Sequence, residues 1–333
     1  MLAFIIFIVI VALIFDFLNG MNDAANSIAT VVSTRVLSPR LAVLWAAFFN
    51  LAAAFFFGVH VAATIGKGVV DPGVVDAVLI LSTLCAAIFW TYMCTHIGLP
   101  ISVSHALVGG LVGSGVAKAG LDALVWHGVL KIAVFIILAP LVGTILGYLF
   151  MVVVYWICRR LTPQRVDRWF RRLQLISAAA YSLGHGTNDA QKTMGIIAVL
   201  LYSTGYLKGE FYVPLWVVLI CHAAIALGTL AGGWRVIKTL GMKMTKLKPV
   251  HGFCAETAAA SSILLSTVGG IPVSTTHTIT GAIIGVGATT RLSAIRWGVA
   301  YRIVWAWILT IPGTAMVAAL IWYLLHLLPL PAR

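Results

Sequence analysis

The stretch GLPISVSH at residues 98–105 returns 172 residues further along the chain as GIPVSTTH at residues 270–277. A second motif is duplicated in the same way, because GMNDA at residues 20–24 returns as GTNDA at residues 186–190. All four segments lie in strongly apolar surroundings. Matched polar segments interrupted by glycine and proline are the best sequence pointer to the substrate site of a secondary transporter. The duplication therefore predicts a transporter built from two related halves.

The composition indicates a membrane protein. Hydrophobic residues make up 61% of the chain and charged residues 9%, whereas about a quarter of a soluble protein is charged. Long apolar runs without two-residue alternation favour membrane-spanning helices over barrel strands. We therefore expect an all-α polytopic protein, integral to the cell membrane and surrounded by the lipid bilayer. The predicted spans include residues 2–15, 41–59, 78–94, 132–158, 213–232 and 305–328.

The net charge of +13 could indicate nucleic-acid binding, but the positions of the basic residues argue against it. They concentrate in residues 159–172 and 235–248, and both segments adjoin apolar runs. Basic residues beside membrane spans are typical of cytoplasmic loops. The five cysteines are odd in number, form no CxxC motif and are interpreted as small apolar residues. Nucleic acid is therefore not an expected partner.

The basic segment divides the chain into two halves with the same order of motifs. We expect one repeat over residues 1–158, a basic connecting loop over residues 159–172, and a second repeat over residues 173–333. Each half contains an Asn-Asp segment, then a Pro-Ser-His segment, and then a long final span. We expect the helix to be interrupted at all four of these segments.

Loop charge predicts how the two halves are oriented. Residues 34–40 hold two arginines, whereas the matching residues 204–212 have no net charge. Residues 234–254 hold five basic residues, whereas the matching residues 62–76 are net negative. Because positive loops face the cytoplasm, matched loops of opposite character indicate an inverted repeat. The central segment 159–172 is then cytoplasmic, and both termini lie outside.

The Pro-Ser-His segments cannot be ordinary helix. Pro100 and Pro272 each remove a helical N–H and disfavour helix at the preceding residue. The serines that follow are good N-cap residues for the glycine-rich helices after them. This pattern predicts two re-entrant hairpins that enter from opposite faces of the membrane, because broken backbone at that depth must be buried in protein or line a wet cavity.

The hairpins are candidate anion sites. A helix N-terminus presents free N–H groups and the positive end of the helix dipole, which together favour an anion. The neighbouring hydroxyls are neutral donors that suit a tetrahedral oxyanion. Lys192 could meet that anion or could pair with Asp189. The predicted substrate-binding residues are Ser102, Ser104, Ser274, Thr275, Thr276, Gln191 and Lys192.

The Asn-Asp motifs supply the opposite charge. A carboxylate inside the membrane is costly, so Asp23 and Asp189 are functional candidates. They would repel an anion unless a cation or a proton lies between, which suggests symport with Na⁺ or H⁺ and no further cofactor. Oxygen ligands fit a hard cation such as Na⁺ at these two residues. Glu256 suggests a second cation or proton site, because its counterpart is Leu84. The predicted cation residues are Asn22, Asp23, Asn26, Asn188, Asp189 and Glu256.

Two histidines accompany the hairpins. His105 and His277 end the duplicated segments at matching positions. We expect them to brace the hairpins rather than to carry protons, and the sequence leaves both roles open.

The duplicated motifs resemble those of the inorganic phosphate transporter (PiT) family. The similarity lies in residues 20–26, residues 186–191 and both Pro-x-Ser-x-x-His segments, and residues 19–50 and 184–195 look closest to bacterial low-affinity phosphate permeases. The resemblance implies an inverted-repeat transporter that moves phosphate with Na⁺ or H⁺, usually as a homodimer. It also implies that the Asn-Asp motifs bind coupling cations and the hairpin hydroxyls bind phosphate. One departure is Val103, which stands where the second hairpin has Thr275.

Three alternatives remain at this point. A sulfate:cation symporter of the same fold is the nearest, although sulfate cannot donate the hydrogen bond that a carboxylate could accept from protonated phosphate. An anion channel would need no matched carboxylates. A membrane enzyme is disfavoured, because the chain has no His-Glu-x-x-His motif or catalytic-triad pattern.

Overall fold

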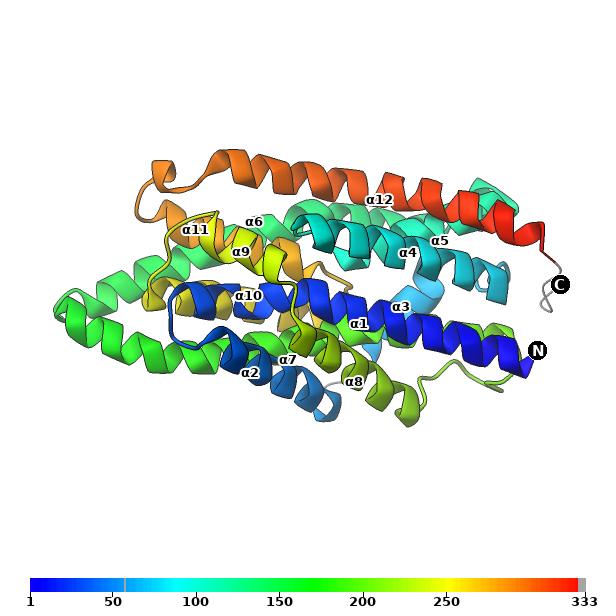
Figure 1. Cartoon of the computed structure of the whole chain (residues 1–333), viewed down its shortest axis with the longest axis horizontal. Coiled ribbons are helices and arrows are strands. Elements are labelled where there is room, and N and C mark those ends of the chain that lie inside the picture. Colours follow the sequence, from blue (N-terminus) through cyan, green and yellow to red (C-terminus); the bar gives the residue numbers. More distant parts are fainter. Residues whose placement is uncertain (57, 329–333) are drawn as a thin grey trace.

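The computed structural model describes residues 1–56 and 58–328, and within them every named element is a helix. The helices form an elongated bundle, most of them running roughly along its long axis (Figure 1). The N-terminus and the last turns of α12 lie at one end, and the α6–α7 connection lies at the other. In chain order the helices are α1 (Leu2–Ser33), α2 (Pro39–Ala52), α3 (His60–Gly68), α4 (Ala77–Ile97), α5 (Val103–Ala119), α6 (Trp126–Cys158), α7 (Pro163–Ser203), α8 (Leu215–Ala231), α9 (Trp234–Met242), α10 (Pro249–Val268), α11 (Thr275–Ala288) and α12 (Trp297–His326).

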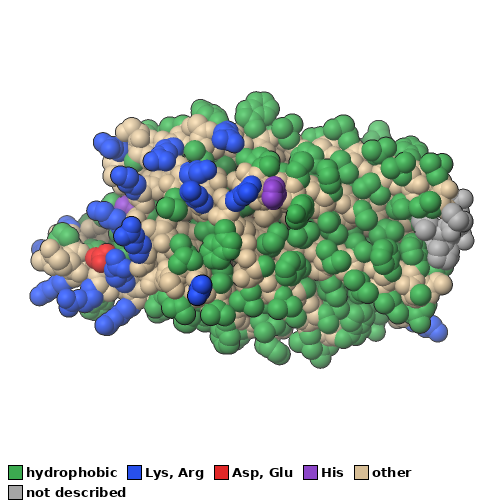
Figure 2. Space-filling view, viewed as in Figure 1, with side chains coloured by type: hydrophobic (Ala, Val, Ile, Leu, Met, Phe, Trp, Pro, Cys, Tyr) green, Lys and Arg blue, Asp and Glu red, His purple; other side chains and the backbone are tan. Residues whose placement is uncertain are grey.

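The predicted membrane-spanning character is confirmed. Among the described residues, α1, α4, α6 and α12 are each long and apolar enough to cross a membrane. Two further helix pairs are apolar enough only when taken together, and each is sharply bent, as in a broken span or a re-entrant loop: α8 and α9 meet at 73°, and α2 with its 3-10 extension meets α3 at 84°. Hydrophobic side chains cover most of the visible surface between the two ends (Figure 2). Such a surface is suited to lipid rather than to water.

Both Pro-containing hairpins are present and have matching backbones. Helix α4 ends at Gly98 with φ 76°, and the corresponding Gly270 after α10 has φ 64°. This left-handed region is accessible to glycine at little cost, which explains the residue type at both turns. Ser102 and Ser274 then cap α5 and α11, each Oγ accepting a hydrogen bond of 3.2 Å from the N–H of His105 or His277. In each hairpin, glycine thus permits the turn that ends one helix, and serine caps the start of the next.

The helix is not interrupted at the Asn-Asp motifs, and here the expectation was wrong. Helix α1 passes unbroken through Asn22-Asp23, and α7 passes unbroken through Asn188-Asp189. Neither motif contains proline, so the backbone can keep its helical hydrogen bonds. Gly20 serves packing instead, since a Cβ there would lie 2.1 Å from the carbonyl oxygen of Ile225. The sharp bends between neighbouring helices fall elsewhere, between α2 and α3 and between α8 and α9.

The basic connecting segment is also less of a loop than expected. Helix α7 already begins at Pro163, a residue well suited to the first helical turn, so only residues 159–162 connect α6 to α7. The remaining arginines lie on the first turns of α7. They contribute to a dense group of basic side chains at this end of the molecule (Figure 2).

The final helix of each half packs against the hairpin helix of the other half. Helix α6 lies along α11, and α12 lies along α5. The backbones approach closely through glycine: a Cβ on Gly113 would lie 2.0 Å from the carbonyl oxygen of Ala315, and one on Gly285 would lie 2.0 Å from that of Thr144. Small residues at helix contacts are the usual way to bring membrane helices together. Each hairpin helix is therefore held against the long final helix of the other half.

This packing yields a stability prediction. Gly113→Ala should destabilise the protein by about 1–3 kcal/mol, because the added methyl meets backbone that cannot rotate away. Thermal unfolding of the purified protein in detergent would measure the effect. Gly298→Ala on α12 is the matched control, since a Cβ there meets nothing within 4 Å. Equal stability of the two variants would contradict the close α5–α12 contact.

Candidate functional site

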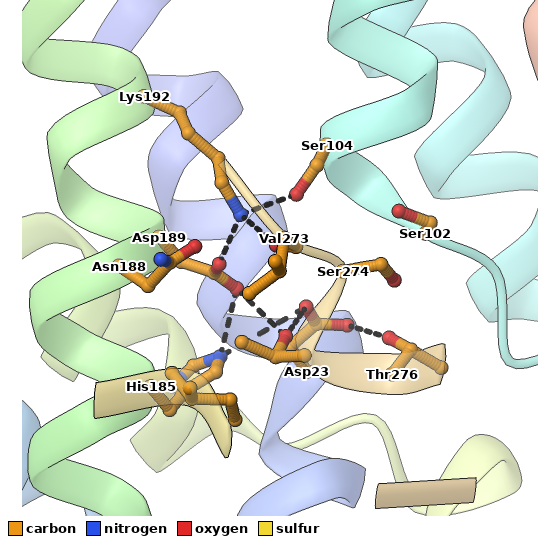
Figure 3. Close-up of polar contacts among 12 residues, drawn as sticks. Asp23, Ser102, Ser104, His185, Asn188, Asp189, Lys192, Val273, Ser274 and Thr276 are labelled. Atoms are coloured by element: carbon orange, nitrogen blue, oxygen red, sulfur yellow. Dashed lines mark hydrogen bonds and ion pairs between the residues drawn. The ribbon is translucent and has the colours of Figure 1, made fainter. Parts of the chain in front are cut away.

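The two Asn-Asp motifs and the second hairpin meet in one buried cluster (Figure 3). The Thr275 hydroxyl lies between the two carboxylates, 3.3 Å from Asp23 Oδ2 and 3.1 Å from Asp189 Oδ2. Its single hydrogen can serve either one. The Thr276 hydroxyl donates to Asp23 Oδ1 at 3.3 Å and accepts from Asn26 Nδ2 at 2.8 Å. Residues that lie up to 253 positions apart in the chain are therefore neighbours.

His185 lies beside both carboxylates, and it was not identified from the sequence. Its Nε2 lies 3.1 Å from Asp189 Oδ2 and 3.9 Å from Asp23 Oδ2, and its Nδ1 lies 3.1 Å from Asn50 Oδ1. Asp23, His185 and Asp189 offer ligand atoms that all lie within 4.8 Å of one another. A possible signal was its spacing, because His185 precedes Asp189 by four residues and so shares its helix face.

Lys192 pairs with Asp189, which was one of the two roles considered for it. Its ammonium group donates to Asp189 Oδ1, to Ser104 Oγ at 2.5 Å and to the Val273 carbonyl oxygen at 2.9 Å. The lysine is only 1% exposed. All three ammonium hydrogens thus have an oxygen partner, which a buried lysine requires.

The asparagines of the two motifs, Asn22 and Asn188, each donate a hydrogen bond to a threonine. Asn22 Nδ2 donates to Thr95 Oγ1 at 2.6 Å, and Asn188 Nδ2 donates to Thr267 Oγ1 at 2.9 Å. Both threonines were missed, although each stands five residues before a hairpin proline. The amide oxygens of Asn22, Asn188 and Asn26 are buried and have no partner among the described residues. Buried polar atoms without partners are rare and require an explanation.

Ser102 and Ser274 lie near the cluster without joining its hydrogen bonds (Figure 3). Each oxygen is engaged as a helix cap, so the hydroxyl hydrogen is left to donate elsewhere. Both serines are buried. Of the hairpin hydroxyls, those of Thr275 and Thr276 contact the carboxylates, whereas Ser102 and Ser274 cap α5 and α11.

Gln191 lies away from the cluster, unlike its neighbours in the sequence. Its Oε1 accepts from the Val61 N–H at 2.8 Å, and its Nε2 donates to the Gly58 carbonyl oxygen at 2.7 Å. It therefore satisfies free backbone groups at the start of α3. The reason is helix geometry: residue 191 is two positions after Asp189 and points to another face of α7. We omit Gln191 from the candidate site.

Glu256 belongs to a separate buried cluster. Its Oε1 accepts from Thr30 Oγ1 at 2.5 Å and from Gln174 Nε2 at 2.9 Å, and its Oε2 accepts from Ser177 Oγ at 2.5 Å. Thr30 follows Asp23 by seven residues on α1, a rise of about 10 Å. The two acidic sites are therefore about two helical turns apart along α1.

The hairpin histidines contact each other. The ring centroids of His105 and His277 lie 4.6 Å apart, and His277 stacks on Trp307 at 3.7 Å. The Trp307 indole N–H donates to the Pro100 carbonyl oxygen at 3.2 Å. This arrangement ties the two hairpins to each other and to α12, as expected for bracing residues.

The whole cluster is closed to solvent. No side chain in it is more than 9% exposed, including both carboxylates and the hydroxyls around them. Charged groups so deep in a membrane bundle are costly and mark ion or substrate paths. An all-helical membrane fold with paired breaks and a buried polar site defines the protein as a transporter.

The chain belongs to the phosphate transporter family, whose pattern matches residues 19–318. It is 59% identical to a "Probable low-affinity inorganic phosphate transporter" of Rhizobium meliloti (strain 1021), over 95% of each chain. It is 42% identical to a protein of the same description from Bacillus subtilis (strain 168), over 97% of each chain. A solved structure titled "The sodium-dependent phosphate transporter" superposes with a TM-score of 0.88 at 28% identity, covering 98% of this chain and 100% of that one. The family and these relatives are transporters rather than enzymes.

Proposed function

We propose that this protein imports inorganic phosphate by symport with Na⁺ or H⁺ through alternating access. The observation that carries the proposal is the buried contact between the two carboxylates, Asp23 and Asp189, and the hydroxyls at the N-terminus of α11. Anion donors and acidic groups can share a site only when a cation or proton compensates the carboxylates. Binding of one ion therefore favours binding of the other.

The proposed phosphate ligands are the hairpin hydroxyls and the helix N-termini behind them. Helices α5 and α11 both begin at this site, and each presents free N–H groups and the positive end of its dipole. The Lys192 ammonium, bonded to Ser104, adds positive charge beside the first hairpin. We assign phosphate to Ser102, Ser104, Ser274, Thr275 and Thr276.

The proposed cation ligands are the carboxylates and the unpartnered amide oxygens. The oxygens of Asn22, Asn26 and Asn188 can accept a hydrogen bond or bind a cation, and oxygen ligands suit a hard cation such as Na⁺. A structural relative is described as sodium-dependent, which makes Na⁺ the first ion to test. Glu256, with Thr30, Gln174 and Ser177, is proposed as a second cation site.

Alternating access follows from the closed site. A buried cluster can exchange ions with both sides only if the bundle opens to each side in turn. We propose that residues 1–158 and 173–333 are inverted repeats that move relative to each other, with residues 159–172 cytoplasmic and both termini outside. The basic end of the molecule in Figure 2 supports that orientation. Sizing of the detergent-solubilised protein would test the homodimer that the resemblance implies.

The decisive experiment is uptake of radiolabelled phosphate into proteoliposomes, with an inward Na⁺ gradient and an inward H⁺ gradient imposed separately. Accumulation driven by one gradient would support symport and name the ion. Gradient-independent leakage would indicate a channel instead. Excess sulfate should compete poorly, because only protonated phosphate can donate a hydrogen bond to Asp23 or Asp189. Abolition of uptake by sulfate would favour a sulfate symporter.

Thr275→Val should weaken phosphate uptake. The valine keeps the shape of the side chain but removes the hydroxyl that lies between Asp23 and Asp189, so we expect the apparent phosphate affinity to fall about tenfold to a hundredfold. Initial uptake rates against phosphate concentration would measure it. The control is Thr278→Val one turn later, whose hydroxyl only bonds the Ser274 carbonyl oxygen. An unchanged affinity in Thr275→Val would remove this hydroxyl from the site.

Glu256→Gln should affect the coupling ion more than phosphate. The substitution removes the charge while keeping the side-chain volume, so the apparent affinity for the coupling ion should fall about tenfold. Phosphate affinity at saturating cation should stay near that of the wild type. Ion-dependence curves of uptake would separate the two effects, and a wild-type ion dependence would limit Glu256 to a structural role.

A further inference from the structure

The oxygen atoms around the Lys192 ammonium form the kind of cage that a metal cation normally occupies. They come from a carboxylate (Asp189), a hydroxyl (Ser104) and a backbone carbonyl (Val273), and from three different segments of the chain (Figure 3). Carboxylate, hydroxyl and carbonyl oxygens are the ligands of hard cations in proteins. The cage lies beside the second carboxylate of the site and is closed to solvent.

The first half contains a matching carboxylate and hairpin hydroxyl, with an asparagine in place of the lysine. Asn26 lies three residues after Asp23, as Lys192 lies three residues after Asp189. Asn26 Nδ2 donates to Thr276 Oγ1, just as Lys192 Nζ donates to Ser104 Oγ. Ser104 and Thr276 are themselves matched positions of the two hairpins, 172 residues apart. We call each aspartate with these neighbours a corner of the site, the Asp23 corner and the Asp189 corner. Both corners contain a carboxylate, a hairpin hydroxyl and a polar residue three positions after the aspartate.

The two corners differ in charge. Asp189 has a cationic partner in Lys192, whereas the hydrogen-bond donors of Asp23 are the neutral hydroxyls of Thr275 and Thr276. The imidazole of His185 lies nearer Asp189 than Asp23. Asn26 supplies a buried amide oxygen without a partner in place of the ammonium. The Asp23 side thus offers oxygen atoms without a cationic side chain, whereas the Asp189 side holds the ammonium of Lys192.

We propose that Lys192 is a tethered cation that replaces one exchangeable coupling ion, so that only the Asp23 corner of this pair takes up an ion in each transport cycle. This inference rests on the proposed symport. A covalently attached ammonium compensates Asp189 in every state without dissociating, and therefore contributes charge but no ion flux. The coupling ion, whether Na⁺ or a proton, then has to neutralise only Asp23 before the anion enters.

The test compares two substitutions of Lys192. Lys192→Asn copies the residue of the first half and opens the cage, whereas Lys192→Met removes the charge but leaves a side chain of similar length in the space. Equilibrium binding of radioactive Na⁺ to each purified protein counts sites without requiring transport. Phosphate uptake in Na⁺ and in choline, a cation too large for the cage, provides the second measurement. Lys131→Asn on α6 controls for loss of a lysine elsewhere.

We expect Lys192→Asn to bind one more Na⁺ per chain than the wild type, and Lys192→Met to gain none. Uptake by Lys192→Asn should fall about a hundredfold or more at low Na⁺, since a buried carboxylate has lost its partner, and should recover at saturating Na⁺. The inference is overturned if Lys192→Asn gains no Na⁺ site, or if it fails to fold in Na⁺ as well as in choline. A wild-type protein that accumulates no phosphate under any gradient would contradict the proposed symport instead, and the site count would still decide the inference.

Discussion

Asp23→Asn is expected to abolish gradient-driven phosphate accumulation while leaving the protein folded. Asparagine matches the volume of aspartate and can still accept a hydrogen bond from Thr275 or Thr276, so the packing of α1 should survive. The substitution removes the carboxylate that we propose is neutralised by the coupling cation. We expect uptake to fall by about two orders of magnitude or more, and the unfolding temperature to change little.

Uptake into proteoliposomes and thermal unfolding in detergent measure these two effects separately. The control is Asp122→Asn, which removes an exposed carboxylate from the short 3-10 helix after α5 and should transport normally. Accumulation by Asp23→Asn at the wild-type rate would end the role proposed for this residue. A folded, inactive protein with retained phosphate binding would be the clearest support.

Asp189→Asn should behave differently, because it removes stability as well as transport. The Lys192 ammonium, 1% exposed, would lose the only anionic partner that it has among the described residues. Removing one member of a buried ion pair costs about 3–5 kcal/mol, since the remaining charge stays desolvated. The two aspartates have the same motif and the same spacing, yet the structure predicts that only one of them is needed for folding.

A double substitution separates the two roles of Asp189. Asp189→Asn combined with Lys192→Met removes both charges, so it should recover much of the stability that Asp189→Asn loses and remain inactive. Unfolding in detergent gives the stability of all four proteins in this cycle. If Asp189→Asn alone is as stable as the wild type, the ion pair is not a folding requirement.

The hairpins could be predicted from the sequence because their causes are local. A proline removes an N–H, a glycine permits positive φ, and a serine caps the next turn, and all three act within a few residues. The membrane spans were predictable for a similar reason, since hydropathy reports burial in lipid directly. The expected break at the Asn-Asp motifs failed because it inferred backbone disruption from polar side chains alone, whereas a helix tolerates them when partners exist in the bundle.

The partners of the polar residues depended on packing. Gln191, Lys192 and Asp189 are near neighbours in the sequence, yet Gln191 supports α3 and Lys192 bonds to both hairpins. His185 lies in the cluster because it is one helical turn before Asp189 on α7 and because α1 brings Asp23 close to it. Sequence spacing gives the face of a helix on which a residue lies but not the helix that packs against that face.

The sequence by itself determined the class of fold and the two hairpins, and it named the candidate hydroxyls and carboxylates. The tertiary structure alone decided which of these groups meet: Thr275 with both carboxylates, Lys192 with Asp189, and Glu256 with a separate cluster. The physical reason is the distance along the chain over which each interaction acts. Backbone conformation follows from residues a few positions apart, whereas charge compensation in a membrane interior depends on side chains brought together from distant parts of the chain.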